Sequence, residues 1–288
     1  FTQQYILKLG IIFLGIRLSF ADFIKFGSIA IPLIIICIVG VLILIKLLIK
    51  KVPISSKMSY LIAIGTSVCG ATAIVATAPV INAKKSEVAY AIANITLFGV
   101  IAMLLYPYFA EWYFDNESLN VGLFLGTSIH ETSQVAAAGL IYDQQFNSPE
   151  TLNVATVTKL IRNTFLVILI PLFAFLYNRG EFKGQKYSIF NIFPYFVLGF
   201  IGMIIVRNLG DQLYPIESNN HEIWVNLIEY LKILATVFLT MAMAAVGISI
   251  NLSELKSMGY KPFVVGLIAA VTVGIISLIY IETLQKFI

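Results

Sequence analysis

The chain has 288 residues, of which 59% are hydrophobic and only 12% are charged, and its mean hydropathy is +0.91. A soluble domain is typically about half apolar and a quarter charged, so this composition excludes a soluble enzyme and indicates a polytopic membrane protein. The formal net charge of +4 is small and fits basic loops better than a nucleic-acid surface, so we expect no nucleic-acid partner.

Apolar runs separated by short polar turns follow one another along the whole chain. They lie at about 4–20, 27–49, 59–81, 86–108, 118–141, 151–178, 188–208, 223–250 and 262–285. A membrane crossing needs roughly 20 apolar residues, and backbone inside a bilayer must be hydrogen-bonded internally, so the runs predict helices. We expect one all-α transporter domain over 1–288, multi-pass in a bacterial cell membrane, with the lipid bilayer around it. Because Phe1 stands in mid-pattern, we also expect that a preceding piece is missing.

Two of these runs have polar middles. Residues 65–73 read GTSVCGATA and residues 126–134 read GTSIHETSQ, so Gly-Thr-Ser followed by a β-branched residue recurs at both centres. Such residues allow a helix to unwind, and unwound backbone is tolerated at membrane depth only where it lines a cavity or is buried in protein. Paired interruptions of this kind are typical of the central site of secondary transporters. The alternative is that the small residues only allow close helix packing.

Charges in the loops bear on how these two runs are threaded. The loops at 50–58, 179–187 and 251–261 are basic, whereas those at 109–118, 141–150 and 209–222 are acidic or nearly free of Lys and Arg. The positive-inside rule puts the basic loops in the cytoplasm, but simple alternation then places Lys84 and Lys85 outside and the acidic 109–118 inside. Both conflicts disappear if 59–81 and 118–141 enter from opposite sides and return.

A short echo near the two ends of the chain suggests an old duplication. GIRLSFADFIKFG at 15–27 and GISINLSELKSMG at 247–259 share Gly-Ile, a lysine and a closing glycine at the same offsets. The two lie an odd number of crossings apart, which predicts inverted topology, as in many secondary carriers.

His130 and Glu131 are unexpected in so apolar a run. Ionisable residues within membrane segments usually face the bundle interior and are functional. Because histidine titrates near neutrality, the pair suits a proton-coupled carrier. The alternative is a structural His–Glu or Glu–Arg bond. Gln134 lies one turn beyond His130 and should share its face.

Two cations in the run 151–178 lie three residues apart on one predicted helical face. Arg162 is farther from the polar end of the run than Lys159, so we expect it to lie deeper and to attract an oxyanion or pair with Glu131. The alternative is a structural ion pair. HETSQ also imitates the zinc motif HExxH, but Gln134 stands where the second histidine is needed, so we expect no metal. Glu229 and Lys232, three apart, should neutralise one another.

The candidate solute-binding residues share a position at or beside the two polar middles. They are Thr66, Ser67, Cys69, Gly70, Thr72, Thr127, Ser128, His130, Glu131, Gln134 and Arg162. Cys69 is included for its position, since a buried thiol more often behaves as a small hydrophobe. We expect no catalytic residue and no cofactor.

Three blocks carry a family resemblance. GTSVCGATAIVATAPVINAKKSEVAYAIANITLFG, GTSIHETSQVAAAG and AMAAVGISINLSELKSMGYKP, in this order, resemble the YeiH-like UPF0324 membrane proteins, often labelled sulfate exporters. The resemblance covers essentially the whole chain and implies a distant grouping with bile-acid symporters and cation/proton antiporter-like carriers. It therefore implies inverted repeats, broken helices that cross near the midplane, and about two helices before Phe1. Many relatives have an acidic residue where Ala78 stands, so no coupling carboxylate is expected there.

These observations predict a secondary transporter of a small anion, such as sulfate or a related sulfur oxyanion. A proton or sodium ion is the expected coupling ion, and a second copy of the chain stays open as a partner. The alternatives are a channel, a lipid-embedded scaffold, or an intramembrane enzyme with a polar site at His130 and Glu131.

Overall fold

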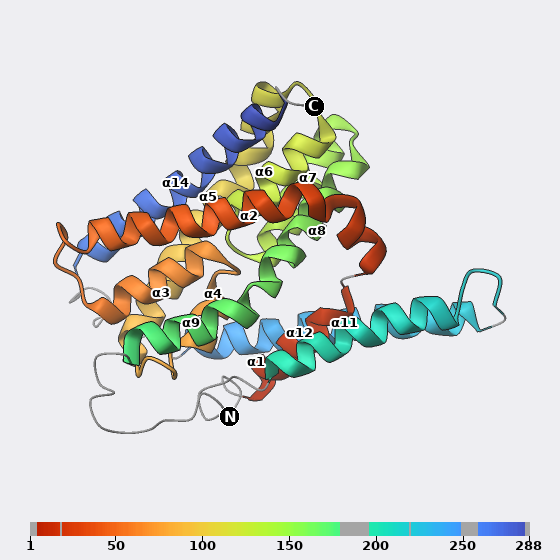
Figure 1. Cartoon of the computed structure of the whole chain (residues 1–288), viewed down its shortest axis with the longest axis horizontal. Helices are drawn as coiled ribbons and strands as arrows, with labels where there is room; N and C mark the ends of the chain where they lie inside the picture. The colour runs from red at the N-terminus through yellow and green to blue at the C-terminus, as the bar shows by residue number, and fades with distance from the viewer. Residues whose placement is uncertain (1–4, 18, 179–195, 219, 249–258, 286–288) are drawn as a thin grey trace. The chain divides into compact units, whose positions relative to one another are not determined.

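The computed structural model describes residues 5–17, 19–178, 196–218, 220–248 and 259–285, and nearly all of them are helical (Figure 1). The chain divides into two compact units. The small unit comprises residues 1–25 and 186–250, and the large unit comprises residues 26–185 and 251–288. Each expected run whose residues are described is helical over most of its length, and 188–195 lie outside the described residues.

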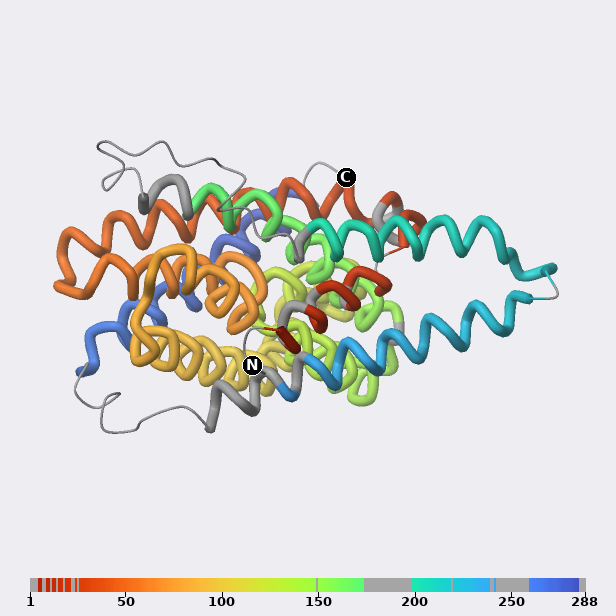
Figure 2. Tube along the Cα trace, turned by 90° about the horizontal axis from the view of Figure 1, so that it is seen from below, coloured from red at the N-terminus to blue at the C-terminus, as the bar shows by residue number. Residues whose placement is uncertain are grey.

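In the small unit, two long helices run antiparallel to each other (Figure 2). These are α11 (Phe196–Leu213) and α12 (His221–Ile248), and α1 (Leu7–Leu14) with the short 3-10 helix η2 (Gly15–Arg17) packs against both. Ile16, Trp224 and Ile228 form a buried apolar cluster here.

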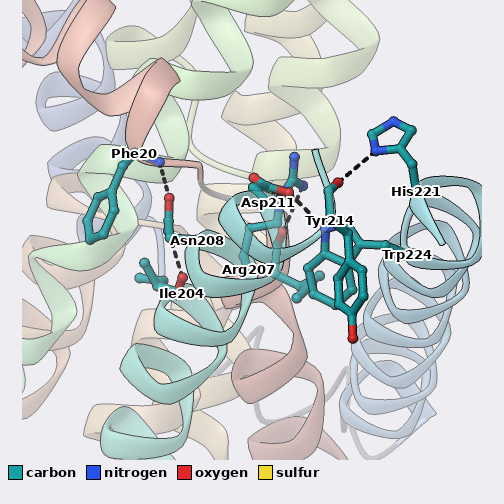
Figure 3. Close-up of polar contacts among 9 residues, drawn as sticks. Phe20, Ile204, Arg207, Asn208, Asp211, Tyr214, His221 and Trp224 are labelled. Carbon is teal, nitrogen blue, oxygen red and sulfur yellow. Dashed lines mark hydrogen bonds and ion pairs between the residues drawn. The ribbon is translucent and has the colours of Figure 1, made fainter. Parts of the chain in front are cut away.

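Two ion pairs lie within the small unit. Asp211 lies between Arg207, whose Nε is 2.7 Å from the carboxylate, and Trp224, whose Nε1 donates over 2.9 Å (Figure 3). As expected, Glu229 and Lys232 form an ion pair, at 4.0 Å. Pairing reduces the cost of placing these charges on apolar helices. We interpret this cluster as structural.

The large unit holds both polar middles. Its helices are α2 (Phe20–Leu48, from residue 26), α3 (Ser56–Ser67), α4 (Ala71–Thr77), α5 (Lys85–Phe114), α6 (Ser118–Ser128), α7 (Thr132–Phe146), α8 (Pro149–Thr164), α9 (Leu166–Asn178) and α14 (Lys261–Gln285). Among the described residues, four stretches are long and apolar enough to cross a membrane, namely Phe26–Leu48, Lys85–Phe114, Glu150–Phe173 and Lys261–Leu284. The protein is therefore an all-α, multi-pass membrane protein.

Helices α3 and α4 form a hairpin. Lys57 Nζ, at the start of α3, donates to the carbonyl of Asn82, beyond the end of α4, over 2.6 Å. A continuous helix would separate residues 57 and 82 by roughly 35 Å at 1.5 Å per residue, so the chain must double back. It does so at Gly70, whose φ of 65° favours a residue without a side chain. We call residues 66–70 the first tip.

Helices α6 and α7 form a second hairpin. The hydroxyl oxygens of Ser118 and Ser148, at its two open ends, are 2.7 Å apart, whereas a continuous helix would separate these residues by roughly 45 Å. Between α6 and α7 the backbone is extended at Ile129 and Glu131. We call residues 127–131 the second tip.

The two hairpins enter from opposite ends of α5. The open end of the first is bonded to the start of α5, where Ser55 Oγ donates to Glu87 over 2.5 Å. The open end of the second is bonded to the other end of α5, where the Tyr142 hydroxyl donates to Glu111 over 2.5 Å. The tips therefore point toward each other.

This threading agrees with the arrangement that the loop charges favour. The family resemblance implied broken helices that cross the membrane, whereas the hydrogen bonds at the open ends show that both segments are interrupted and return. The echo between 15–27 and 247–259 cannot be followed, since 249–258 lie outside the described residues.

Helix α8 packs along both arms of the second hairpin. Gly122 and Gly126 of α6 lie directly against Val154 and Thr158 of α8, where any side chain would collide. This close approach brings the next turn of α8, with Lys159 and Arg162, to the two tips.

Candidate functional site

The two tips expose backbone carbonyls that their own helices cannot satisfy. The last carbonyls of a helix have no intrahelical partner, and together they carry the negative end of its dipole. Here the ends of α3 and α6 are both buried in the large unit, with Thr66, Ser67, Thr127 and Ser128 at most 1% exposed. Such carbonyls need donors from elsewhere in the protein.

Arg162 supplies donors to both tips. Its Nε donates to the carbonyl of Ser67 over 2.8 Å, its Nη1 donates to that of Thr127 over 2.5 Å, and its Nη2 donates to that of Thr66. The planar guanidinium has five N–H donors in a fixed fork, which suits several carbonyls at once. Arg162 thus ties the end of α3 to the end of α6.

Lys159 does the same one turn earlier on α8. Its Nζ donates to the carbonyl of Val68 over 2.8 Å and to that of Ile129 over 2.9 Å. Both residues are 0% exposed, so Lys159 is as fully buried in the protein as Arg162. Lys159 was missed as a candidate solute-binding residue, and the sequence signal that could have included it is its helical spacing of three from Arg162.

Glu131 makes a third link between the tips. Its carboxylate accepts the backbone N–H of Ala71, the first residue of α4. A side chain at Gly70 would collide with this carboxylate, so both the conformation and the space at Gly70 require glycine. Arg162 gives its described hydrogen bonds to carbonyls rather than to Glu131, so the expected Glu–Arg bond is not formed.

Several buried polar atoms around the tips have no hydrogen-bond partner among the described residues. They are Thr66 Oγ1, Ser67 Oγ, Ser128 Oγ, Thr158 Oγ1 and both ring nitrogens of His130. Leaving a buried donor or acceptor unsatisfied costs about 1–3 kcal/mol, so these atoms are available to bond a polar group other than the described residues. The described structure also forms no His130–Glu131 bond, which was the other structural alternative.

Two of the predicted site residues have side chains that are bonded within the protein. The Gln134 amide donates to the carbonyl of Thr96 over 3.2 Å and lies against Gly99 of α5, and its oxygen accepts the backbone N–H of Glu131 over 3.3 Å, so it caps α7 rather than joining His130. The Thr127 hydroxyl is 2.7 Å from both the Leu123 carbonyl and Ser277 Oγ of α14. Thr127 therefore contributes only its backbone carbonyl to the tips.

The remaining candidates lie at or beside the first tip. Cys69 is a buried free thiol, and Thr72 is buried in the first turn of α4. Cys69 is close enough to Glu131, Lys159 and Arg162 to interact with their charges. Of these two candidates, Cys69 therefore lies beside the charged groups.

Charged side chains of both signs meet at the tips. Lys159 and Arg162 are two buried cations, while Glu131 is the carboxylate that interacts with Lys159. These side chains carry one formal positive charge in excess when the imidazole is neutral, and the negative ends of the α3 and α6 dipoles lie against the two cations. Within the described residues, no group of three or more His, Cys, Asp or Glu lies close enough to hold a metal ion.

Comparison with known proteins places the chain in a family. The family model described as "Conserved hypothetical protein 698" matches residues 1–266. A UPF0324 membrane protein of Streptococcus agalactiae is 35% identical over 280 residues, covering 96% of this chain and 79% of the relative. One from Fusobacterium nucleatum is 34% identical, with 96% and 81% covered, and the UPF0324 inner membrane protein YeiH of Escherichia coli K12 is 33% identical, with 93% and 73% covered. No solved structure matches. The chain, with its paired hairpin tips, therefore belongs to the UPF0324 family of membrane proteins.

Proposed function

We propose that this protein is a secondary carrier of a small anion, which binds between the two tips and α8. The observation that carries this proposal is the coincidence of two fully buried cations with unpartnered hydroxyls and imidazole nitrogens. The cations attract a negative solute, and the hydroxyls of Thr66, Ser67 and Ser128 can donate to its oxygens.

A sulfur oxyanion such as sulfate fits this chemistry. Its oxygens only accept hydrogen bonds, so a site for it needs donors and positive charge rather than apolar walls. The two cations and the unpartnered hydroxyls at the tips supply such donors and such charge.

The threading of the large unit supports a carrier. Helices α3 to α5 comprise a hairpin followed by a long helix, and α6 to α8 repeat this pattern from the opposite end. Inverted repeats with interrupted helices at a shared central site are typical of alternating-access carriers. The matched Gly-Thr-Ser sequences, which end α3 and α6, lie at equivalent positions of the two halves.

His130 and Glu131 provide the means of coupling to protons. Both belong to the second tip, and Glu131 also reaches the first tip through Ala71. Protonation of either side chain makes the site more positive and strengthens its hold on an oxyanion. Proton and anion movement would thereby be linked.

The test is solute counterflow in proteoliposomes. Vesicles loaded with unlabelled sulfate should transiently accumulate external labelled sulfate, and thiosulfate or sulfite should be tried in the same way. A channel would equilibrate the label without transient accumulation, and an enzyme would move none. Lack of counterflow with all three anions would refute a sulfur-oxyanion carrier.

Two serine variants connect transport to the tips. Ser128→Ala removes an unpartnered hydroxyl of the second tip, whereas Ser277→Ala removes a buried hydroxyl that is bonded to Thr127. We expect Ser128→Ala to weaken the apparent affinity for the anion and Ser277→Ala to leave it unchanged. Equal effects from the two variants would place the solute elsewhere.

A further inference from the structure

Lys159 and Arg162 lie where carriers with interrupted helices usually bind a coupling cation. In such carriers, unwound carbonyls and the C-terminal ends of half-helices coordinate Na⁺ or H⁺. In this chain, carbonyls of that kind accept hydrogen bonds from the two side chains of α8. They are the carbonyls of Thr66, Ser67 and Val68 on the first tip and of Thr127 and Ile129 on the second.

The Lys159 ammonium is the better substitute for a metal ion. It is a compact point charge, and it sits 2.8 Å from the carbonyl of Val68 and 2.9 Å from that of Ile129. Each carbonyl comes from a different hairpin, so one monovalent positive charge bridges the two tips. A sodium ion bound to the same carbonyl oxygens would bridge the two tips in the same way.

Arg162 occupies the adjacent carbonyls. Its guanidinium donates hydrogen bonds to the carbonyls of Ser67 and Thr127, again one from each tip. Its Nη1 is also 3.5 Å from the carbonyl of Ile129. A further cation at this position would meet carbonyls that already accept hydrogen bonds and two fixed positive charges. Like charges at such short range repel strongly in a buried site.

We propose that Lys159 and Arg162 are built-in cations that replace a coupling sodium ion, so that transport by this protein is independent of Na⁺. This inference rests on the proposed carrier function and narrows its coupling. The positive charge that holds the tips together belongs to the protein and does not move with the solute. A proton is then the coupling ion that the site can still accept, on the second tip.

The first test compares transport in sodium and in choline. Anion counterflow by the wild-type protein should have the same initial rate in proteoliposomes made with sodium salts and with choline salts. Loss of counterflow when choline replaces sodium would overturn the inference while leaving the carrier function intact. Lack of any anion transport in either salt would instead count against the proposed function.

A second test removes the built-in cation. Lys159→Ala uncovers the carbonyls of Val68 and Ile129, so the folded variant should lose counterflow in choline and regain part of it with Na⁺ or ammonium. Lys232→Ala is the control, because Lys232 is a partly exposed lysine paired with Glu229 in the small unit. It should transport equally in all three salts. A folded Lys159→Ala variant that responds to neither cation would contradict the assignment.

A third measurement needs neither transport nor a folded variant. The melting temperature of the purified wild-type protein should be equal in sodium chloride and choline chloride of the same ionic strength. A ligand that binds only the folded state raises the melting temperature, so a sodium-specific increase would reveal a bound sodium ion and overturn the inference.

Discussion

Replacing Arg162 by Ala should destabilise the protein more than any other single truncation on α8. The substitution removes three hydrogen bonds to carbonyls of two hairpins and leaves these carbonyls buried without donors. It also leaves the Lys159 ammonium alone to hold the tips together. The loss therefore combines missing bonds with uncompensated polar groups.

The magnitude can be bracketed from both sides. Polar contacts between helices in membranes are worth about 0.6 kcal/mol each on average, so three bonds give a lower bound of about 2 kcal/mol. Removing one partner of a buried charged arrangement typically costs about 3–5 kcal/mol, which is the upper bound. Lys159→Ala removes two bonds rather than three, so it should cost roughly two thirds as much by the same per-bond figure.

The assay is reversible unfolding of the purified protein in mixed micelles with increasing denaturing detergent. Arg207→Ala is the matched control, because Arg207 is a partly exposed arginine in an i,i+4 ion pair, for which about 0.3–0.5 kcal/mol is typical. If Arg162→Ala lowered the free energy of unfolding no more than Arg207→Ala, the carbonyl contacts of Arg162 would be refuted. Arg162→Lys, which keeps the charge but loses the planar fork, should fall between the two.

Three further predictions concern the tips and the hairpins. Gly70→Ala should lower the free energy of unfolding by about 1–3 kcal/mol, because the new side chain would combine a positive φ with a collision with Glu131. Gly259→Ala is the control and should cost less, because Gly259 has a similar φ of 69° but open space around it. Thermal unfolding of both variants would show whether the Glu131 contact matters. A disulfide should form when Ser118→Cys and Ser148→Cys are combined in a background with Cys37 and Cys69 replaced by Ala, because the two serine hydroxyl oxygens are 2.7 Å apart. A cysteine pair that stays reduced under oxidant, as measured by mass spectrometry, would contradict the second hairpin. Glu131→Gln and His130→Gln should each flatten the dependence of anion counterflow on pH, and two folded variants with wild-type rate and wild-type pH profile would show that the pair is structural.

The sequence alone determined the class of protein, the helices and the location of the two interruptions. Composition and apolar runs are sufficient for this because a bilayer admits only helices of a certain length and makes each interruption costly. The repeated Gly-Thr-Ser therefore marked both tips, at the residues where α3 and α6 end. Loop charges also favoured two returning segments over two crossing ones, which is the threading of the described structure.

Only the tertiary structure decided which polar groups meet. Lys159 and Arg162 appear in the sequence only as two cations on one helical face, and the structure shows that both are fully buried, because α8 lies against glycines of α6 along its preceding turns. Gln134 and Thr127 looked like solute-binding residues, but the Gln134 side chain is bonded to α5 and to the backbone of Glu131, and the Thr127 hydroxyl is bonded to α14. Helical spacing predicts which residues share a face, but the partners of that face depend on which element packs beside it. The backbone carbonyls that receive the two cations have no signature in the sequence, because every residue carries one and only the ends of buried helices leave it free.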